Sequence, residues 1–257
     1  MELGIAGRTA LVCASTSGLG LASARALATE GVKTVICGRR GDLARREAAA
    51  LPEAIGVEID LERPDAARRL ADAAAEAFGP IDILVLNSAG PPAGMAAEQD
   101  RESLLAAVRR LLLPHDDLIR ECLPGMLDRG WGRIIGIGST GITEPLPGLA
   151  LSNVARAGLA GLLKTLASEV ADRGVTVNMV IPGRIATERL AALDQWWADK
   201  AGRDVAEERA RSQAMIPARR YGTPEEFGAA VAFLAGQPAA YITGSLVRVD
   251  GGLARGY

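Results

Sequence analysis

Short apolar runs alternate along the chain with longer stretches in which apolar residues recur at helical spacing. Strands that are hydrophobic throughout, rather than at every second position, are typical of a parallel sheet covered on both faces. The pattern predicts strands at Thr9–Cys13, Lys33–Cys37, Ala54–Ile59, Ile83–Leu86, Arg133–Ile137, Thr176–Val180 and Leu246–Val249. We therefore expect an α/β fold, a Rossmann-like doubly wound parallel sheet of about seven strands with helices on both faces.

Helical periodicity fills most of the gaps between these strands. The clearest helices are expected at Leu19–Glu30, Asp65–Phe78, Val154–Ala171 and Pro224–Leu234. A further helical stretch, Ser103–Leu127, contains Pro114. Proline lacks an N–H and clashes with the preceding turn, so this stretch should kink or split.

The helix at Val154–Ala171 carries Ala155, Gly158 and Gly161 close to one face. Each glycine costs about 1 kcal/mol of helix stability relative to alanine. Close packing would offset that cost. The neighbour is either the sheet of the same chain or a second copy of the protein.

The chain shows no linker, internal repeat or low-complexity tract. A single domain over residues 1–257 is therefore expected. The segment Thr187–Pro217 is polar, helical and inserted late. We interpret it as a lid over a substrate cleft.

Composition excludes several classes of protein. The formal net charge is −2 and the positive residues are scattered, which gives no basic surface for nucleic acid. Cys13, Cys37 and Cys122 are odd in number and lack metal-ligand spacing, so neither a disulfide framework nor a metal site is predicted. Without a signal peptide or a run of roughly 18 apolar residues, a cytoplasmic protein without membrane contact is expected.

A glycine-containing turn directly follows the first predicted strand, in the stretch Cys13-Ala14-Ser15-Thr16-Ser17-Gly18-Leu19-Gly20. Small residues at the mouth of a helix let backbone N–H groups and the helix N-terminus face a pyrophosphate. An ordinary tight turn is the alternative. The position after the first strand of an alternating β/α pattern favours a phosphate site.

The turn and several later motifs together resemble the short-chain dehydrogenase/reductase family, and in particular its 3-oxoacyl-acyl-carrier-protein reductases. The family turn is Thr-Gly-x-x-x-Gly-x-Gly, and Ala14 replaces its first glycine, so the turn should use a conformation that alanine accepts. The other matching motifs are Asp60, Asn87-Ser88-Ala89-Gly90, Ser139, Asn178 with Pro182-Gly183 and Thr187, and Asp250-Gly251-Gly252.

The resemblance implies a dinucleotide-binding domain with a defined set of contacts. Asp60 would contact the adenine, and Ile185 and Thr187 would hold the nicotinamide carboxamide. The cofactor-binding residues that it implies are Ala14, Ser15, Ser17, Gly18, Leu19, Gly20, Arg39, Asp60, Leu61, Asn87, Ala89, Gly90, Arg156, Pro182, Gly183, Ile185 and Thr187.

The end of the second predicted strand indicates which dinucleotide is preferred. An acidic residue there accepts hydrogen bonds from the ribose of NAD, whereas an arginine accommodates the additional phosphate of NADP. The chain reads Gly38-Arg39-Arg40 at this place, and Arg39 is positioned for a charge-assisted contact. We expect NADP(H) to be preferred, with NAD(H) possible. An arginine that merely sits on the surface is the alternative.

The resemblance also implies a reacting centre that departs from the family. Family members carry Tyr-x-x-x-Lys, a serine and an asparagine. Ser139 matches the serine, whereas Ser152 and Arg156 stand at the tyrosine and lysine positions. The asparagine position aligns with Arg110 or a neighbour. Ser139, Ser152 and Arg156 are the predicted catalytic residues.

Other residues are weaker candidates for proton transfer or substrate contact. His115 follows Pro114, and a kink there can turn it inward, although a surface position is the simpler expectation. The remaining candidates are Tyr221 and Tyr241 as substitute acids, Thr143 and Glu144 at the cleft rim, and Trp196 and Trp197, which either cover an apolar substrate or pack the lid on the body.

Three functions follow from this interpretation. The first is an NADP(H)-dependent oxidoreductase acting on a small-molecule carbonyl compound, of 3-oxoacyl-thioester or ketone type, with an atypical proton source. The second is a dinucleotide-binding member without catalysis that acts as a sensor or partner subunit. The third is a non-redox elimination in the same cleft. Family resemblance further implies a homo-oligomer, either a tetramer or a dimer.

Overall fold

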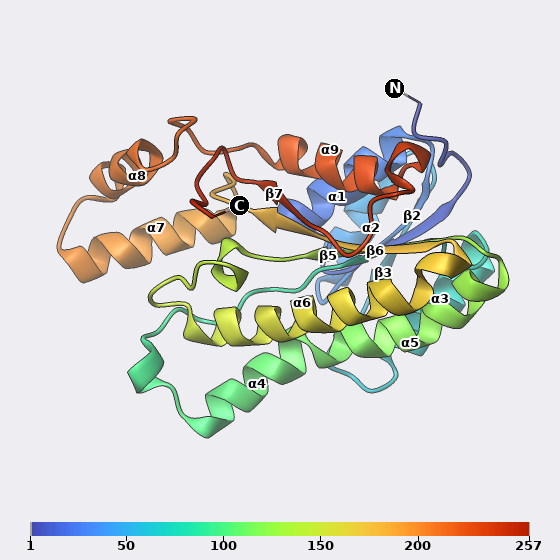
Figure 1. The fold of residues 1–257 in the computed structure, drawn as a ribbon, viewed down its shortest axis with the longest axis horizontal. Coiled ribbons are helices and arrows are strands. Elements are labelled where there is room, and N and C mark those ends of the chain that lie inside the picture. Colours follow the sequence, from blue (N-terminus) through green and yellow to red (C-terminus); the bar gives the residue numbers. More distant parts are fainter. Residues whose placement is uncertain (1, 257) are drawn as a thin grey trace.

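The computed structural model describes residues 2–256, whose strands form one parallel sheet in the order β3-β2-β1-β4-β5-β6-β7 (Figure 1). The strands are β1 (Thr9–Val12), β2 (Lys33–Gly38), β3 (Ala54–Glu58), β4 (Ile83–Leu86), β5 (Gly132–Ile137), β6 (Val175–Pro182) and β7 (Leu246–Val249). The order reverses direction between β1 and β4, where ligands bind in doubly wound folds. The predicted fold class is confirmed.

Helices cover both faces of this sheet (Figure 1). One face packs against α1 (Gly18–Thr29), α2 (Gly41–Ala49) and α9 (Pro224–Ala235), and the other against α3 (Ala66–Ala77), α5 (Leu113–Asp128) and α6 (Ala150–Val170). Successive strand residues serve opposite layers, since Leu11 lies in the core beneath α5 and α6 while Val12 lies beneath α1 and α9. This two-sided burial explains the continuous hydrophobic runs.

The long helix before β5 is split as Pro114 predicts. α4 (Arg101–Leu111) ends at Leu112, whose φ of −123° and ψ of −59° are not helical, and α5 begins at Leu113. Pro114 is therefore the second residue of a new helix, where its missing N–H costs nothing. The break redirects the start of α5 toward the end of β4.

The glycines of α6 do not pack within the chain as closely as their cost suggests. Gly158 and Gly161 are both exposed. A Cβ at Gly158 would meet only a methyl group of Leu112 at 3.5 Å, and one at Gly161 would meet nothing within 4 Å. Close packing against the sheet is therefore the wrong interpretation for Gly161, and a second copy of the chain stays a prediction.

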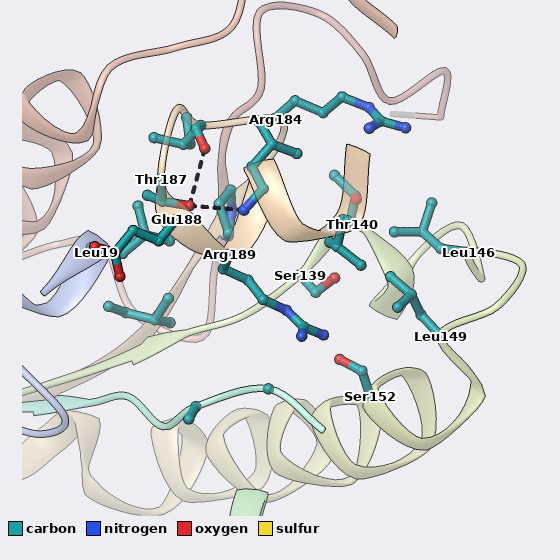
Figure 2. Close-up of a pocket in the computed structure, with 18 of the residues that line it drawn as sticks. Leu19, Ser139, Thr140, Leu146, Leu149, Ser152, Arg184, Thr187, Glu188 and Arg189 are labelled. Carbon is teal, nitrogen blue, oxygen red and sulfur yellow. Dashed lines mark hydrogen bonds between the residues drawn. The ribbon is translucent and has the colours of Figure 1, made fainter. Parts of the chain in front are cut away.

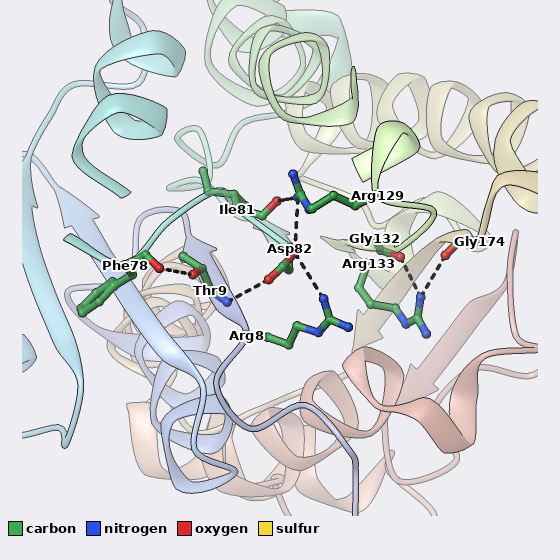
Figure 3. Close-up of polar contacts among 9 residues, drawn as sticks. All are labelled: Arg8, Thr9, Phe78, Ile81, Asp82, Arg129, Gly132, Arg133 and Gly174. Carbon is green, nitrogen blue, oxygen red and sulfur yellow. Dashed lines mark hydrogen bonds and ion pairs between the residues drawn. The ribbon is translucent and has the colours of Figure 1, made fainter. Parts of the chain in front are cut away.

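Polar side chains close the amino-terminal edge of the sheet (Figure 3). Asp82 accepts a hydrogen bond from the backbone N–H of Thr9 and pairs with Arg8 at 3.6 Å and with Arg129 at 3.3 Å. Arg133 donates to the carbonyl oxygens of Gly132 and Gly174. Arg8, Arg129 and Arg133 at this edge thus each have an acceptor within the chain.

The segment interpreted as a lid forms α7 (Glu188–Ala201) and α8 (Val205–Ala214), which project from the carboxyl edge of the sheet (Figure 1). The Tyr221 hydroxyl donates to both carboxylate oxygens of Asp194, at 2.9 and 3.1 Å, and Arg184 lies 3.6 Å from the same carboxylate. This buried cluster fixes α7 to the loops on either side of the segment. No helix in residues 2–256 is long and apolar enough to span a bilayer.

Candidate active site

A cleft of about 1600 Å³ opens at the carboxyl ends of the strands. It brings together almost all of the residues that the sequence assigned to a dinucleotide and to catalysis. The predicted residues that line it are Ala14, Ser17, Gly18, Leu19, Arg39, Asp60, Leu61, Asn87, Ala89, Gly90, Ser139, Ser152, Arg156, Pro182, Gly183, Ile185 and Thr187. Ser15 and Gly20 lie beneath the cleft rather than in its wall.

The turn after β1 adopts a conformation that was not expected for its sequence. Ala14 has φ +44°, in the left-handed region, so the expectation that the turn avoids this conformation is wrong. The neighbouring structure holds it there, because the Asn87 side-chain amide donates to the carbonyl oxygens of Cys13 and Ala14. The turn thus keeps its glycine-like shape without the glycine.

Two buried residues of the turn, Ser15 and Gly20, explain why small side chains are needed there. Ser15 is buried, and its hydroxyl donates to the Val12 carbonyl oxygen at 2.6 Å and accepts from the Cys37 N–H at 3.0 Å. A Cβ at Gly20 would lie 2.6 Å from the Ala14 carbonyl oxygen and 2.8 Å from Nδ2 of Asn87. Both residues shape the turn instead of facing a ligand.

The start of α1 fits a pyrophosphate. Ser17 is the N-cap residue, but its side chain makes no capping hydrogen bond, and the first turn of α1 holds no acidic residue. The backbone N–H groups of Gly18 and Leu19 are thus positioned at the cleft wall with the positive end of the helix dipole behind them. The residues present therefore fit a dinucleotide in this cleft.

The two arginines after β2 differ in their contacts. Arg40 donates to the hydroxyls of Thr16 at 3.3 Å and Ser17 at 3.4 Å, so it supports the phosphate turn directly. Arg39 is exposed and lines the cleft. Sequence reasoning singled out Arg39 alone, because contacts of Arg40 with the turn depend on the tertiary structure.

Asp60 and Leu61 line the same end of the cleft after β3. The Asp60 carboxylate accepts a hydrogen bond from the Glu62 N–H at 3.2 Å. Glu62 in turn pairs with Arg110, whose Nε lies 2.9 Å from its carboxylate. Arg110 thus forms an ion pair at the cleft wall. It does not replace the neutral amide of the asparagine that other family members carry at this position.

Ser139 lies two residues after the end of β5 and caps the short 3₁₀ turn Thr140–Ile142. Its Oγ accepts a hydrogen bond from the Gly141 N–H at 3.1 Å. Because that bond uses a lone pair of the oxygen, the hydroxyl proton stays free to be donated into the cleft. The side chain is therefore oriented as a donor to a ligand oxygen.

Ser152 and Arg156 lie one turn apart on α6 and both line the cleft. Ser152 is only 8% exposed. Arg156 donates from Nη1 to the carbonyl oxygen of Ile137 at 2.6 Å and reaches that of Gly138 at 3.4 Å. Burial, with a smaller contribution from the charge of Arg189, lowers the pKa of Arg156 to about 10, so it remains a cation near neutral pH.

Arg189, in the first turn of α7, is the main site residue that sequence reasoning missed. Its guanidinium points into the cleft between Ser139 and Ser152 (Figure 2). Nη2 donates to the Pro91 carbonyl oxygen at 2.7 Å, and burial lowers the pKa of the group. No local signal marks it, because it is one charged residue in a polar helical segment.

His115 is buried, at 1% exposure, so the expected surface position is wrong. The helix break turns it toward Asn87 and Arg156. Burial is the main cause that lowers its pKa to about 4, and the positive charge of Arg156 adds to the shift. Backbone groups of Asn87 and Leu111 oppose the shift, yet neither ring nitrogen has a hydrogen-bond partner of normal geometry. It is a neutral imidazole behind the reacting centre.

The remaining candidate acids and rim residues have other roles. Tyr221 is bound to Asp194, and Tyr241 is fully exposed. Glu144 lines the cleft but accepts hydrogen bonds from the N–H groups of Arg255 and Gly256. Neither tyrosine lines the cleft, so neither serves as a substitute acid there.

Trp196 and Trp197 were expected either to cover an apolar substrate or to pack the lid on the body of the protein. Trp197 lines the cleft, and both rings lie against Gly148, where a Cβ would come 2.8 Å from the ring of Trp196 and 3.4 Å from that of Trp197. Their rings meet edge to face with centroids 4.6 Å apart. Both rings therefore pack α7 on the loop before α6, and Trp197 is also available to an apolar ligand.

The nicotinamide end of the expected site is rigid. Gly183 lies so close to Asp250 that a Cβ would be 2.6 Å from its Cα. Thr187 caps α7, because its hydroxyl accepts from the Leu190 N–H and donates to the Ile185 carbonyl oxygen, both at 3.3 Å (Figure 2). Thr143 donates to the Thr140 carbonyl oxygen and does not line the cleft.

The chain matches a known protein family along nearly its whole length. Residues 13–254 match the family model described as enoyl-(acyl carrier protein) reductase. The chain is 34% identical to the 3-oxoacyl-(acyl-carrier-protein) reductase of Vibrio cholerae over 98% of its own length and 99% of that protein. It is 35% identical to dehydrogenase/reductase SDR family member 4 of Sus scrofa, over 96% of this chain and 87% of that protein.

Solved structures of reductases resemble this fold closely. L-sorbose reductase from Gluconobacter frateurii, complexed with NADPH and L-sorbose, superimposes with a TM-score of 0.93 at 30% identity over the whole of both chains. A variant of actinorhodin polyketide ketoreductase with NADPH gives a TM-score of 0.93 at 34% identity over 97% of this chain and 98% of that one. The chain belongs to the short-chain dehydrogenase/reductase family, the oxidoreductases that this family model describes.

Proposed function

We propose that this protein is an NADP(H)-dependent reductase of small-molecule carbonyl compounds, of the 3-oxoacyl-thioester or ketone type. The observation that supports it most is the Ser139 hydroxyl, which lies in the same cleft as the phosphate turn with its proton free. The NADPH complexes of the sorbose reductase and the polyketide ketoreductase support the cofactor.

The cofactor's two ends have separate partners in the chain. The turn at residues 14–20 and the start of α1 would bind the pyrophosphate, and Arg39 would bind the additional phosphate of NADP. Pro182, Gly183, Ile185 and Thr187 would hold the nicotinamide. When bound, the reduced nicotinamide supplies a hydride to the carbonyl carbon.

The chain's residues act on the carbonyl oxygen. Ser139 donates a hydrogen bond to that oxygen and stabilises the charge that develops on it. Ser152 and Arg156 occupy the positions that a tyrosine and a lysine hold in other family members. Arg156 stays protonated, so it supplies positive potential and does not give up a proton.

Water delivers the proton, relayed by the Ser152 hydroxyl, because no phenol or imidazole of the described residues lines the cleft. A positioned acid typically contributes 10²–10⁴-fold, on the order of 3–5 kcal/mol of barrier. We therefore expect activated ketones and quinones to be reduced faster than simple ketones. The segment at residues 187–217 acts as the lid, and Trp197 covers apolar parts of the substrate.

The test is NADPH consumption with a panel of acetoacetyl thioesters, diketones and quinones. Replacing Ser139 with alanine should lower the rate by roughly 10²–10³-fold, as loss of an oxyanion donor does elsewhere. Ser168→Ala, on the exposed face of α6, is the matched control and should leave the rate unchanged. Tight NADPH binding without consumption on any compound would contradict a reductase and favour a dinucleotide-binding partner protein or a non-redox reaction.

A further inference from the structure

The reacting centre holds a second cation that the proposed hydride transfer does not require. Arg189 points its guanidinium between Ser139 and Ser152 (Figure 2). Its contact with the Pro91 carbonyl oxygen uses one N–H of Nη2. A guanidinium carries five N–H donors in a planar fork, so several remain to face the cleft.

Neither arginine of the centre has an acidic partner. No carboxylate of residues 2–256 lies within ion-pair distance of Arg156 or Arg189. Three other cations of the cleft wall are neutralised, since Arg110 pairs with Glu62, Arg184 with Asp194 and Arg203 with Glu208. At the opposite edge of the sheet, Arg8 and Arg129 share Asp82 (Figure 3).

The acids nearest the centre are directed elsewhere. Glu144 is bound to the backbone of Arg255 and Gly256. Glu188, the residue before Arg189, extends toward Leu19 (Figure 2). Two like charges without an acidic partner therefore lie in the half of the cleft beside Ser139, where the charge of Arg189 helps to lower the pKa of Arg156, and an anion from outside the chain would relieve their repulsion.

We propose that the substrate is an oxo acid, whose carboxylate is bound by the free N–H groups of Arg189 while its carbonyl faces Ser139. The inference rests on the proposed reductase function and narrows its substrate class. The cofactor's phosphates do not account for Arg189, because its guanidinium points between Ser139 and Ser152, beside β5, whereas the phosphate turn and Arg39 follow β1 and β2. A planar guanidinium matches a carboxylate with two parallel hydrogen bonds.

Pairs of acids and their methyl esters test this proposal, because each pair keeps the carbonyl and differs in charge. Acetoacetate and levulinate would be compared with methyl acetoacetate and methyl levulinate as substrates with NADPH. A hydrogen bond to a charged group contributes about 1.5 kcal/mol at the lower end of its usual range, and that end suits an exposed side chain. This free energy corresponds to roughly a tenfold change, so kcat/KM for at least one acid should exceed that for its ester roughly tenfold. In Arg189→Gln that preference should disappear, and in Arg189→Lys part of it should remain.

Arg68→Gln, which removes one positive charge on the exposed face of α3, should keep the preference. Titration calorimetry of the NADP⁺-loaded protein with acetoacetate and levulinate gives a readout that does not depend on turnover, and Arg189→Gln should abolish the heat. Esters that equal their acids in the wild type, or a preference unchanged in Arg189→Gln, would overturn the inference while leaving a reductase. Acid binding that requires Arg189 without any NADPH consumption would support the inference and contradict the proposed function.

Discussion

The side-chain amide of Asn87 donates a hydrogen bond to the carbonyl oxygen of Ala14, 3.2 Å away, and thereby joins the end of β4 to the turn after β1. Ala14 is held at φ +44°, where a Cβ is unfavourable. The strain lies in the backbone that must face the cofactor, so the turn is fixed before any ligand binds.

Ala14→Gly should raise the free energy of unfolding by about 1 kcal/mol, because glycine removes the penalty of the left-handed conformation. Urea denaturation measures the change. Ala26→Gly, within α1, is the matched control and should lower stability by about 1 kcal/mol. A loss of stability in Ala14→Gly would show that the turn relaxes to another conformation in solution.

Gly20→Ala should abolish dinucleotide binding, because the new methyl group would displace the Ala14 carbonyl and the Asn87 amide together. Gly161 is at an exposed position of α6, where an added Cβ meets open space, so Gly161→Ala should retain binding and raise stability by about 1 kcal/mol. Fluorescence titration with NADPH distinguishes the two variants. Normal binding by Gly20→Ala would contradict the role of the turn.

Arg39→Ala should raise the Kd for NADPH roughly tenfold, through loss of one charge-assisted hydrogen bond, and leave the Kd for NADH unchanged. Arg45→Ala, on the exposed side of α2, is the control that removes a nearby charge outside the cleft. Equal weakening of both cofactors in Arg39→Ala would assign the residue to the shared part of the dinucleotide instead of the extra phosphate.

His115 should make the protein less stable in acid. Its pKa is about 4 in the folded chain and 6.5 in the unfolded chain, so between these values the unfolded state binds more protons. Stability is therefore complete above pH 6.5 and falls by up to about 3 kcal/mol as the pH decreases to 4.

His115→Leu should remove this part of the pH dependence while other groups keep theirs. The measurement is urea unfolding at several pH values for both proteins. Parallel curves for the two proteins would mean that the pKa of the imidazole is the same in the folded and the unfolded chain.

Ser152→Tyr together with Arg156→Lys should raise activity on a simple ketone, because a phenol beside an ammonium supplies the missing acid. A gain of at least roughly 10² is expected if proton transfer limits the rate. Each single replacement serves as a control, since either one alone leaves the pair incomplete. No gain in a double variant that still binds NADPH would argue against these positions as the family's tyrosine and lysine sites.

The strands and the phosphate turn could be predicted because their signals are local. A strand buried on both faces reads as an apolar run, and β4 and β7 are predicted to the residue, while the other strands differ by one or two residues at an end. Ser139 and the residues after β3 and β4 follow the same logic, since parallel strands place their carboxyl ends along one edge.

Residues whose role depends on tertiary structure could not be predicted in this way. Arg189 is one charge in a polar segment until α7 folds over the cleft. His115 was expected on the surface, because a polar residue on a helix usually faces solvent, yet the break at Leu112 turns it inward. The conformation of Ala14 is imposed by Asn87, far away in the chain.

The carboxylate of Glu144 holds the backbone of Arg255 and Gly256 at the mouth of the cleft. Arg255 lines the cleft, so polypeptide continuing beyond Gly256 starts beside the route that a substrate takes, whereas the first described residues lie well away from α7 and α8 (Figure 1). Purification tags and immobilisation linkers therefore belong at the amino terminus, where they do not obstruct the entrance.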